Sequence, residues 1–431
     1  MTGINVKFYT LGCKTNLYES DAMAELFRHA GHQVVMGKEP ADICVINTCT
    51  VTGTGAQKSR QQIRRVRREH PDAVVAVTGC LTQTEGETLR DELGADVILG
   101  NKYRNQIVEL TMRALSGEKI YAVENILKED SFEEMGTVSR QGRVRANLKI
   151  EDGCNNFCAY CIIPYARGPV RSRALSEIRK EAEALGDAGY QEVVLTGIHI
   201  GSYGRDKTDG TTLADVIETV HQAEGISRIR LGSLEPVVVT EEFVQRMKKL
   251  PKLCPQFHMS LQSGCDETLK RMRRRYTAEE YRQSVLRLKE AFPDVAITTD
   301  LMVGFAGETE EEFAQSYAFC REMGFAQMHI FPYSVRKGTA AESFGGQVPE
   351  PVKQERAQKM LALATTMKEE FYQKYIGKVL PVLIEQKKGN CYHGTCANYM
   401  DVMVETEQDL TGQIVPVTMT EFKNEMLKGI M

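Results

Sequence analysis

Three cysteines lie close together in the stretch "EDGCNNFCAYCIIPYARG": Cys154, Cys158 and Cys161. Thiolates are good ligands for zinc and for iron–sulfur clusters. A structural zinc ion normally takes four ligands as two close pairs, whereas this loop offers three with Cys-x3-Cys-x2-Cys spacing. A [4Fe–4S] cluster held by three cysteines leaves one iron open to a cofactor or substrate. The spacing therefore favours such a cluster over zinc or inert thiols.

Three further cysteines each follow a short β-branched run. Cys13 ends "VKFYTLGC", Cys49 ends "DICVINTC" and Cys80 ends "AVVAVTGC". The carboxyl ends of parallel strands lie along one edge of a sheet, where ligands bind, so we predict a second three-thiolate site there. The alternative is that these are buried apolar residues, as free cysteines commonly are. The other cysteines lack such a pattern and are predicted to be structural: Cys44, Cys254, Cys265, Cys320, Cys391 and Cys396.

The segments that position these cysteines divide the chain into four parts. In residues 1–125 strand-like runs alternate with helical stretches, which indicates a doubly wound parallel α/β sheet. Residues 126–143 have no clear periodicity and are predicted to be a linker. Residues 144–375 contain six strand–helix units, which predicts an incomplete (β/α)6 barrel with the three-cysteine loop at its carboxyl-terminal mouth. Residues 376–431 contain short strands separated by turns, typical of a small β-barrel.

Composition places the chain among globular proteins, with 431 residues, 42% of them hydrophobic, and a net charge of −4. No apolar run approaches the ~20 residues that a membrane span needs, so we expect a cytoplasmic protein without a membrane partner.

Basic residues gather in "SRQQIRRVRREH" and "KRMRRRY", where Arg64, Arg65 and Arg68 could share a helix face that contacts either phosphates or only water. Tyr392 and Tyr399 could stack bases or pack in a core.

The Cys-x3-Cys-x2-Cys loop, with the aromatic Tyr160 before its last cysteine, resembles the signature of radical S-adenosylmethionine enzymes. In that family S-adenosylmethionine chelates the open iron of the cluster and yields a 5′-deoxyadenosyl radical that abstracts a hydrogen atom. The resemblance therefore implies that Cys154, Cys158 and Cys161 hold the cluster and that the open iron seats the cofactor.

Essentially the whole chain resembles the methylthiotransferases of that superfamily, in stretches such as "TLGCKTNLYES", "NTCTV", "LTGIHIGSYG", "SLQSGCDETLKRM" and "FPYSVRKGTAA". The resemblance implies a second [4Fe–4S] cluster on Cys13, Cys49 and Cys80, a second S-adenosylmethionine as methyl donor, and a terminal TRAM module, which is associated with RNA binding. The sequence is most similar to members that convert N6-threonylcarbamoyladenosine at tRNA position 37 to its 2-methylthio derivative. That activity implies the tRNA anticodon loop and an external electron donor as partners.

Further site residues are assigned by position. Gly197, Ser233, Glu235 and Val303 lie where related barrels contact S-adenosylmethionine, and with Tyr160 they are predicted to bind that cofactor, although a glycine after a strand is also ordinary in turns. No catalytic side chain beyond the clusters is identified. The arginines that follow the cluster loop are predicted to bind a carboxylate or phosphate of the substrate or cofactor, or else to lie in a solvated turn: Arg167, Arg171 and Arg173.

Other functions stay open on the sequence alone. Within the enzyme class the rival substrates are isopentenyladenosine at tRNA position 37 and an aspartate of a ribosomal protein. An iron–sulfur carrier would explain the cysteines but not the six-unit barrel, and an RNA-binding module would explain the basic runs but not the cysteines. Formation of 5′-deoxyadenosine would separate the enzyme from the carrier.

Overall fold

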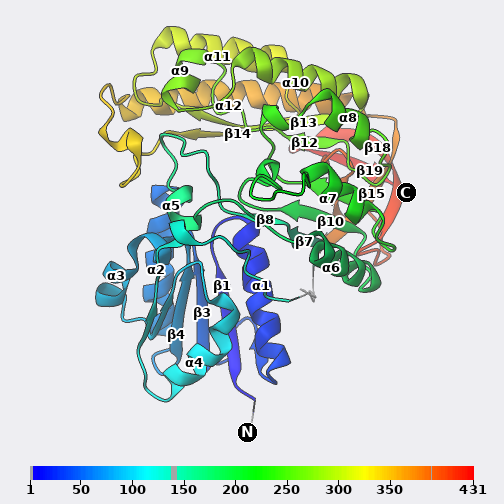
Figure 1. The fold of residues 1–431 in the computed structure, drawn as a ribbon. Helices are drawn as coiled ribbons and strands as arrows, with labels where there is room; N and C mark the ends of the chain where they lie inside the picture. The colour runs from blue at the N-terminus through cyan, green and yellow to red at the C-terminus, as the bar shows by residue number, and fades with distance from the viewer. Residues whose placement is uncertain (1–2, 137–142, 390) are drawn as a thin grey trace.

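The computed structural model describes residues 3–136, 143–389 and 391–431. Figure 1 shows an N-terminal domain, coloured blue to cyan, beneath a larger green-to-yellow domain, with a small red barrel at the carboxyl end packed beside the latter. The predicted linker is only partly described, since 137–142 lie outside these ranges. Among the described residues, no helix combines the length and the apolar character needed to cross a membrane.

The N-terminal domain is built on one sheet of six parallel strands in the order β2-β1-β3-β4-β5-β6. The central strands β3 and β4 are buried along their whole length, which explains their continuous apolar runs. The strand order reverses between β1 and β3, a topological switch point at which doubly wound folds bind ligands. The strands are β1 (Asn5–Thr10), β2 (Gln33–Val35), β3 (Ile43–Thr48), β4 (Val74–Gly79), β5 (Val97–Leu99) and β6 (Ile120–Ala122).

Helices cover both faces of this sheet, so the predicted doubly wound architecture is confirmed. Helices α1 (Lys14–His29) and α4 (Ile107–Leu115) bury apolar side chains such as Phe27 and Leu110 against one face. Helices α2 (Gly53–Glu69) and α3 (Cys80–Leu93) bury side chains such as Ile63 on the other. The amphipathic pattern of each helix thus decides which stripe faces the sheet.

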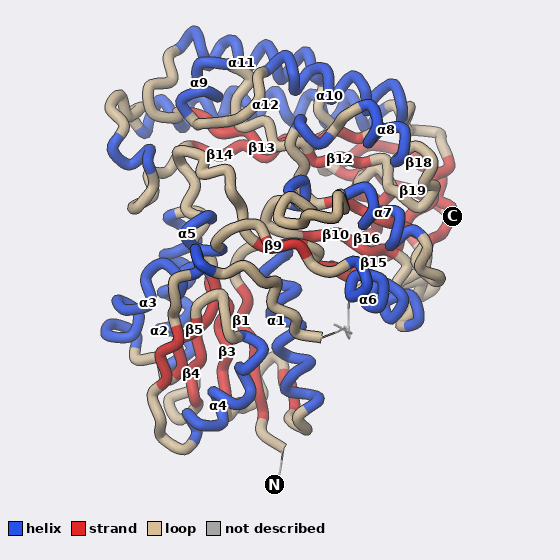
Figure 2. Tube along the Cα trace, in the orientation of Figure 1, coloured by secondary structure: helices blue, strands red, loops and turns tan. Residues whose placement is uncertain are grey.

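The second domain is the predicted open barrel of six parallel strands (Figure 2). Sheet β11-β10-β7 continues into sheet β12-β13-β14 through isolated bridges, including Ile229 to Leu253. Its strands are β7 (Arg145–Lys149), β10 (Glu192–Thr196), β11 (Arg228–Leu231), β12 (Gln256–His258), β13 (Ala296–Val303) and β14 (Gln327–Pro332).

Helices on the outside of the barrel begin where the sequence supplies capping residues. Thr212, Thr277 and Thr309 each form a capping box with an acidic residue three positions later, which satisfies two backbone N–H groups at each helix start. The main outer helices are α6 (Leu175–Asp187), α7 (Leu213–His221), α8 (Glu241–Met247), α10 (Ala278–Ala291), α11 (Glu310–Met323) and α12 (Glu350–Gln373).

The carboxyl-terminal strands close into the small barrel that the sequence predicts, in the order β15-β16-β17-β19-β18. Two arginines of β11 fasten it to the larger domain. Arg228 donates to the carbonyl oxygens of Thr395 at 3.0 Å and Pro381 at 2.7 Å, and Arg230 donates to that of Ala397 at 3.0 Å. The strands are β15 (Val379–Lys388), β16 (Cys391–Cys396), β17 (Asp401–Glu405), β18 (Ile414–Lys423) and β19 (Met426–Ile430).

The described part of the predicted linker is held against both neighbouring domains. Glu133 accepts from Arg104 Nε at 2.8 Å in the first domain, and Glu134 pairs with Arg173 at 2.8 Å in the second. The ring of Phe132 lies beneath Lys149 Nζ, 5.2 Å from the ring centroid. The absence of periodicity in this segment therefore reflects contacts made by single side chains.

Candidate functional site

The three N-terminal cysteines lie at the carboxyl ends of three adjacent strands, as the sequence predicts. Cys13 caps α1 after β1, Cys49 follows β3, and Cys80 begins α3 after β4. Cys13 is exposed, whereas Cys49 and Cys80 are buried. Gly12, with φ of +106°, allows the close approach, because a Cβ there would lie 3.0 Å from Cys49 Sγ.

The second group lies in the loop after the short strand β8 (Glu151–Asp152). Backbone hydrogen bonds fix this loop: Ala159 N–H donates to the carbonyl of Met272 at 2.9 Å, and Cys161 N–H donates to that of Cys158 at 3.0 Å. Burial raises the pKa of Cys154 and of Cys161 to about 12, and negative charge on the neighbouring cysteines adds to the effect. Binding a metal centre here therefore means displacing protons from desolvated thiols.

Neither group has the compact spacing of ligands around one zinc ion. Sulfurs on a tetrahedral zinc lie about 3.8 Å apart, because each Zn–S bond is about 2.3 Å. Within the described ranges, the single set of three His, Cys, Asp or Glu ligand atoms that lie within 4.8 Å of one another is His258, Asp300 and His329. Two sets of three thiols with wider spacing suit polynuclear clusters, in which each sulfur binds a different iron.

A short helix, α5 (Ile163–Arg167), begins two residues after Cys161 and packs against α3 of the first domain. Its last residue, Arg167, donates from Nε to Cys80 Sγ at 3.1 Å. Burial raises the pKa of Cys80 to about 11, while the Arg167 charge acts in the opposite direction. Arg167 thus connects the loop of one cysteine triad to a member of the other.

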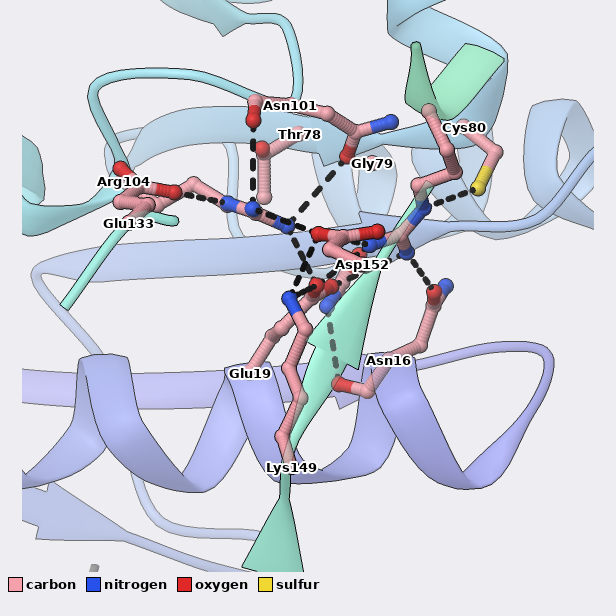
Figure 3. A network of polar contacts seen from close by, with 12 residues as sticks. Asn16, Glu19, Thr78, Gly79, Cys80, Asn101, Arg104, Glu133, Lys149 and Asp152 are labelled. Atoms are coloured by element: carbon pink, nitrogen blue, oxygen red, sulfur yellow. Dashed lines mark hydrogen bonds and ion pairs between the residues drawn. The ribbon is translucent and has the colours of Figure 1, made fainter. Parts of the chain in front are cut away.

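Arg167 belongs to a buried ionic network between the two domains. Figure 3 shows other members of it, Glu19, Arg104, Lys149 and Asp152. Glu19 of α1 pairs with Arg104 Nη1 at 2.6 Å, Lys149 Nζ at 2.8 Å and Arg167. Asp152 of β8 pairs with Lys149 at 2.6 Å. Burial works to raise the pKa of Glu19, but the Arg104, Arg167 and Lys149 charges outweigh it and hold that pKa well below its usual range.

The three arginines predicted to bind substrate are all buried in such contacts. Arg171 donates to the carbonyl oxygens of Arg167 and Pro169, each at 2.8 Å. Arg173 pairs with Glu181 and with Glu134. These groups fix the cluster loop in the structure, and their contact with substrate stays a prediction.

Sequence reasoning missed the partners that neutralise these arginines. One signal was available: Lys149 and Asp152 interrupt the apolar strand run "ANLKIEDG", and Glu19 lies on the α1 face that also buries Tyr18 and Met23. Charged residues on a buried face need partners of opposite charge. Because those partners lie far apart along the chain, the sequence alone could not show which charges pair.

The positions predicted to contact S-adenosylmethionine lie in different environments, and Glu235 contacts the loop that carries the second triad. Glu235 accepts from Asn156 Nδ2 at 2.9 Å and pairs with Arg274 at 2.7 Å. Burial of Glu235 acts against its ionisation, but a hydrogen bond from His199 and the Arg274 charge hold its pKa at about 2. Arg274 also donates to Cys158 Sγ at 3.3 Å.

The other four predicted positions differ in exposure. Gly197 and Ser233 line a cavity of about 320 Å³ whose wall also includes Cys13. Tyr160 packs edge-on against Phe305, with ring centroids 6.3 Å apart. Val303 is buried in the barrel core. Contact of all five residues with the cofactor remains a prediction.

The predicted RNA-binding side chains also fall into two groups. Arg64, Arg65 and Arg68 are exposed on α2, with Arg65 paired to Glu69 at 2.8 Å. Tyr392 is buried in the core of the small barrel, so packing accounts for it. Tyr399 instead lines the cavity, where Arg230 lies over its ring at 4.8 Å from the centroid.

Comparisons with known proteins match both large domains. A model of the Radical SAM superfamily matches residues 148–320, and one described as Uncharacterized protein family UPF0004 matches residues 5–100. In fold, the chain is similar to the radical S-adenosylmethionine methyltransferase TsrM from Kitasatospora setae, with a TM-score of 0.59 over 77% of this chain and 75% of that one. At 15% identity this likeness concerns the fold alone.

Two curated relatives align over almost their full length. Threonylcarbamoyladenosine tRNA methylthiotransferase MtaB of Bacillus subtilis (strain 168) is 42% identical, over 96% of this chain and 93% of that protein. The tRNA-2-methylthio-N(6)-dimethylallyladenosine synthase of Finegoldia magna is 33% identical, over 98% of this chain and 93% of that protein. With both domain types present and this degree of identity along the chain, the protein belongs to the radical S-adenosylmethionine methylthiotransferase family.

Proposed function

We propose that this protein is a tRNA methylthiotransferase that converts N6-threonylcarbamoyladenosine at position 37 to its 2-methylthio derivative. The observation that carries the proposal is one cavity whose wall holds Cys13 of the first cysteine triad together with Gly197 and Ser233, at the strand ends of the barrel that carries the second triad. A base in this cavity would lie between the two sets of groups that the reaction needs. The 42% identity to the Bacillus subtilis enzyme supports this choice of substrate.

The residues present fit two iron–sulfur clusters. Cys154, Cys158 and Cys161 would hold one [4Fe–4S] cluster and leave an iron open, and the triad at the edge of the first sheet would hold the second. When bound with S-adenosylmethionine, such clusters supply a 5′-deoxyadenosyl radical and a methylthio group. Gly12 supports this fit, because its missing side chain leaves room beside Cys49 Sγ.

The protein itself would position these groups and keep water away from them. The ion pairs of Glu19 would hold the first domain against the barrel domain and so keep the two cysteine triads at a fixed separation. Arg167 and Arg274 place N–H donors at Cys80 Sγ and Cys158 Sγ, and such donors stabilise negative charge on a ligating thiolate. A cavity of about 320 Å³ can take a single unstacked base, such as the anticodon loop offers, but not a duplex.

Other parts of the chain would bind the rest of the tRNA in the cytoplasm. The exposed arginines of α2 and the small closed barrel, which matches the expected TRAM module, offer contacts to phosphates and unpaired bases. An external electron donor would reduce the cluster of the barrel.

The test is nucleoside analysis after reaction of anaerobically reconstituted protein with S-adenosylmethionine, a reductant and tRNA. We expect 2-methylthio-N6-threonylcarbamoyladenosine from tRNA that carries the threonylcarbamoyl group. Relatives named dimethylallyladenosine synthases, at 33% identity, make isopentenyladenosine tRNA the matched comparison. Preference for that tRNA, or activity on a ribosomal protein alone, would overturn the assignment.

A further inference from the structure

The cavity beside Cys13 has a polar wall toward the inside of the barrel. Lys14 enters from the start of α1, and side chains of β12, β13 and β14 face it from the barrel. Alternate residues of a strand point to the same face, so His329 lies beside Gln327 on β14. The polar side chains of the wall that matter for its charge are Lys14, Gln256, His258, Thr298 and His329.

One acidic group next to this wall, Asp300, is already engaged. Asp300 Oδ2 lies 3.2 Å from His258 Nε2, and His258 Nδ1 lies 3.0 Å from Thr298 Oγ1. Because Thr298 Oγ1 accepts from Gln256 Nε2 at 3.0 Å, its own hydrogen is free to point at His258 Nδ1. In this chain of bonds His258 Nε2 faces the Asp300 carboxylate.

Two basic side chains of the wall lack such partners. Among the described residues, neither Lys14 Nζ nor the His329 ring has a hydrogen bond or an ion pair to another side chain, and both are exposed to the cavity. They lie close enough for the Lys14 charge to act on His329: burial lowers the pKa of His329, the Asp300 charge raises it, and the His258 and Lys14 charges lower it further. Lys14 is therefore the cation of this pair that has no counter-charge bonded to it within the described part of the chain, and a cation in a crevice favours an anion.

We propose that Lys14 and His329 bind the carboxylate of the threonylcarbamoyl group and thereby select this modified base. The inference rests on the proposed function and names the residues that would read the substrate. An N–H donor on each side of the cavity can take one carboxylate oxygen in a charge-assisted hydrogen bond. An isopentenyl group would leave the Lys14 ammonium desolvated without a partner, which opposes its binding.

A divalent metal ion is the competing occupant of this wall. The ligand atoms of His258, Asp300 and His329 lie within 4.8 Å of one another, a spacing that one ion could bridge. The Lys14 ammonium, whose charge acts on His329, repels a cation, however, and the Asp300 carboxylate is already engaged with His258. The electrostatics of the wall therefore favour an anion.

The test compares two anticodon stem-loops that differ in one charge: one carries N6-threonylcarbamoyladenosine at position 37, and the other its methyl ester. We expect the wild-type protein to methylthiolate the ester with a kcat/KM about 10- to 100-fold lower, since a charge-assisted hydrogen bond is lost. Lys14→Met and His329→Gln should each lower kcat/KM for the acid by about 10-fold or more, mainly through KM, because the carboxylate is remote from C2. On the ester, the loss caused by either variant should be several-fold smaller than on the acid, because the ester offers no carboxylate for these groups to bind.

Lys38→Met is the matched control, because it removes one lysine charge from an exposed loop of the same domain and should leave both reactions unchanged. Equal losses on acid and ester, or no loss on the acid, would overturn the proposal. His329→Gln keeps the test decisive if Lys14→Met disturbs the neighbouring Cys13. Stoichiometric zinc in the wild type that disappears in His329→Gln would assign the wall to a metal. Absence of product from the acid with wild-type protein would instead defeat the proposed function itself.

Discussion

Replacing Glu19 by glutamine removes a negative charge that three buried cations share. In the structure Glu19 is fully buried and pairs with Arg104, Lys149 and Arg167, of which the first belongs to the N-terminal domain and the others to the barrel domain. Removing one partner of a buried ion pair lowers the free energy of unfolding by about 3–5 kcal/mol, because the remaining charge stays buried without a partner. We expect Glu19→Gln to lose about that much free energy of unfolding and to loosen the contact between the two domains.

The assay is urea unfolding followed by circular dichroism, with iron content measured in parallel. Glu370→Gln is the control, because its pair with Arg321 is exposed, with side-chain exposures of 52% and 49%, and should contribute at most about 1 kcal/mol. A loss in Glu19→Gln no larger than in this control would refute the argument that the network holds the domains together.

The pH dependence of Glu19→Gln supplies a second check. The folded-state pKa of Glu19 is depressed below its ordinary value of about 4.5, so its stabilisation is present above that pH and is lost as pH falls toward the folded-state value. The stability difference between wild type and variant should therefore stay constant between pH 7 and about pH 5.5 and shrink below about pH 4.5. A difference that grows on acidification would contradict the assigned sign.

Three further predictions follow from the same geometry. Replacing Cys13, Cys49 and Cys80 together by alanine should halve an iron content of about eight per chain while S-adenosylmethionine cleavage persists, and unchanged iron would rule out the second cluster. Gly12→Ala should cause the same partial iron loss, because its Cβ would lie 2.9 Å from Cys49 Cβ; Gly94→Ala, also at positive φ but with nothing within 4 Å of a Cβ, should keep its iron. Burial raises the pKa of Glu151 to about 8, so the folded state retains a proton there that the unfolded state releases above about pH 4.5. Stability should fall by up to about 1.4 kcal/mol per pH unit between those values, and urea titrations of Glu151→Gln should lack this slope; an identical slope in wild type and variant would show that another group titrates.

The sequence by itself determined where the two cysteine triads lie. Cys13, Cys49 and Cys80 are 31 or more residues apart, yet each follows a strand of one parallel sheet, and parallel strands end at a common edge. The six strand–helix units and the terminal barrel could also be predicted from the sequence. The period-2 pattern of strands and the period-3.6 pattern of helices are local properties of the chain.

Only the tertiary structure decided what the polar side chains do. From the sequence, Arg167 is a basic residue beside the three-cysteine loop with no acidic partner nearby. In the structure it pairs with the Glu19 carboxylate, 148 residues away along the chain. Tyr392 and Tyr399 look alike in sequence, and the barrel closure buries one and turns the other toward the cavity. Lys14 and His329 line the same cavity only because the first sheet docks at the mouth of the barrel, and docking depends on shape and charge that no local pattern encodes.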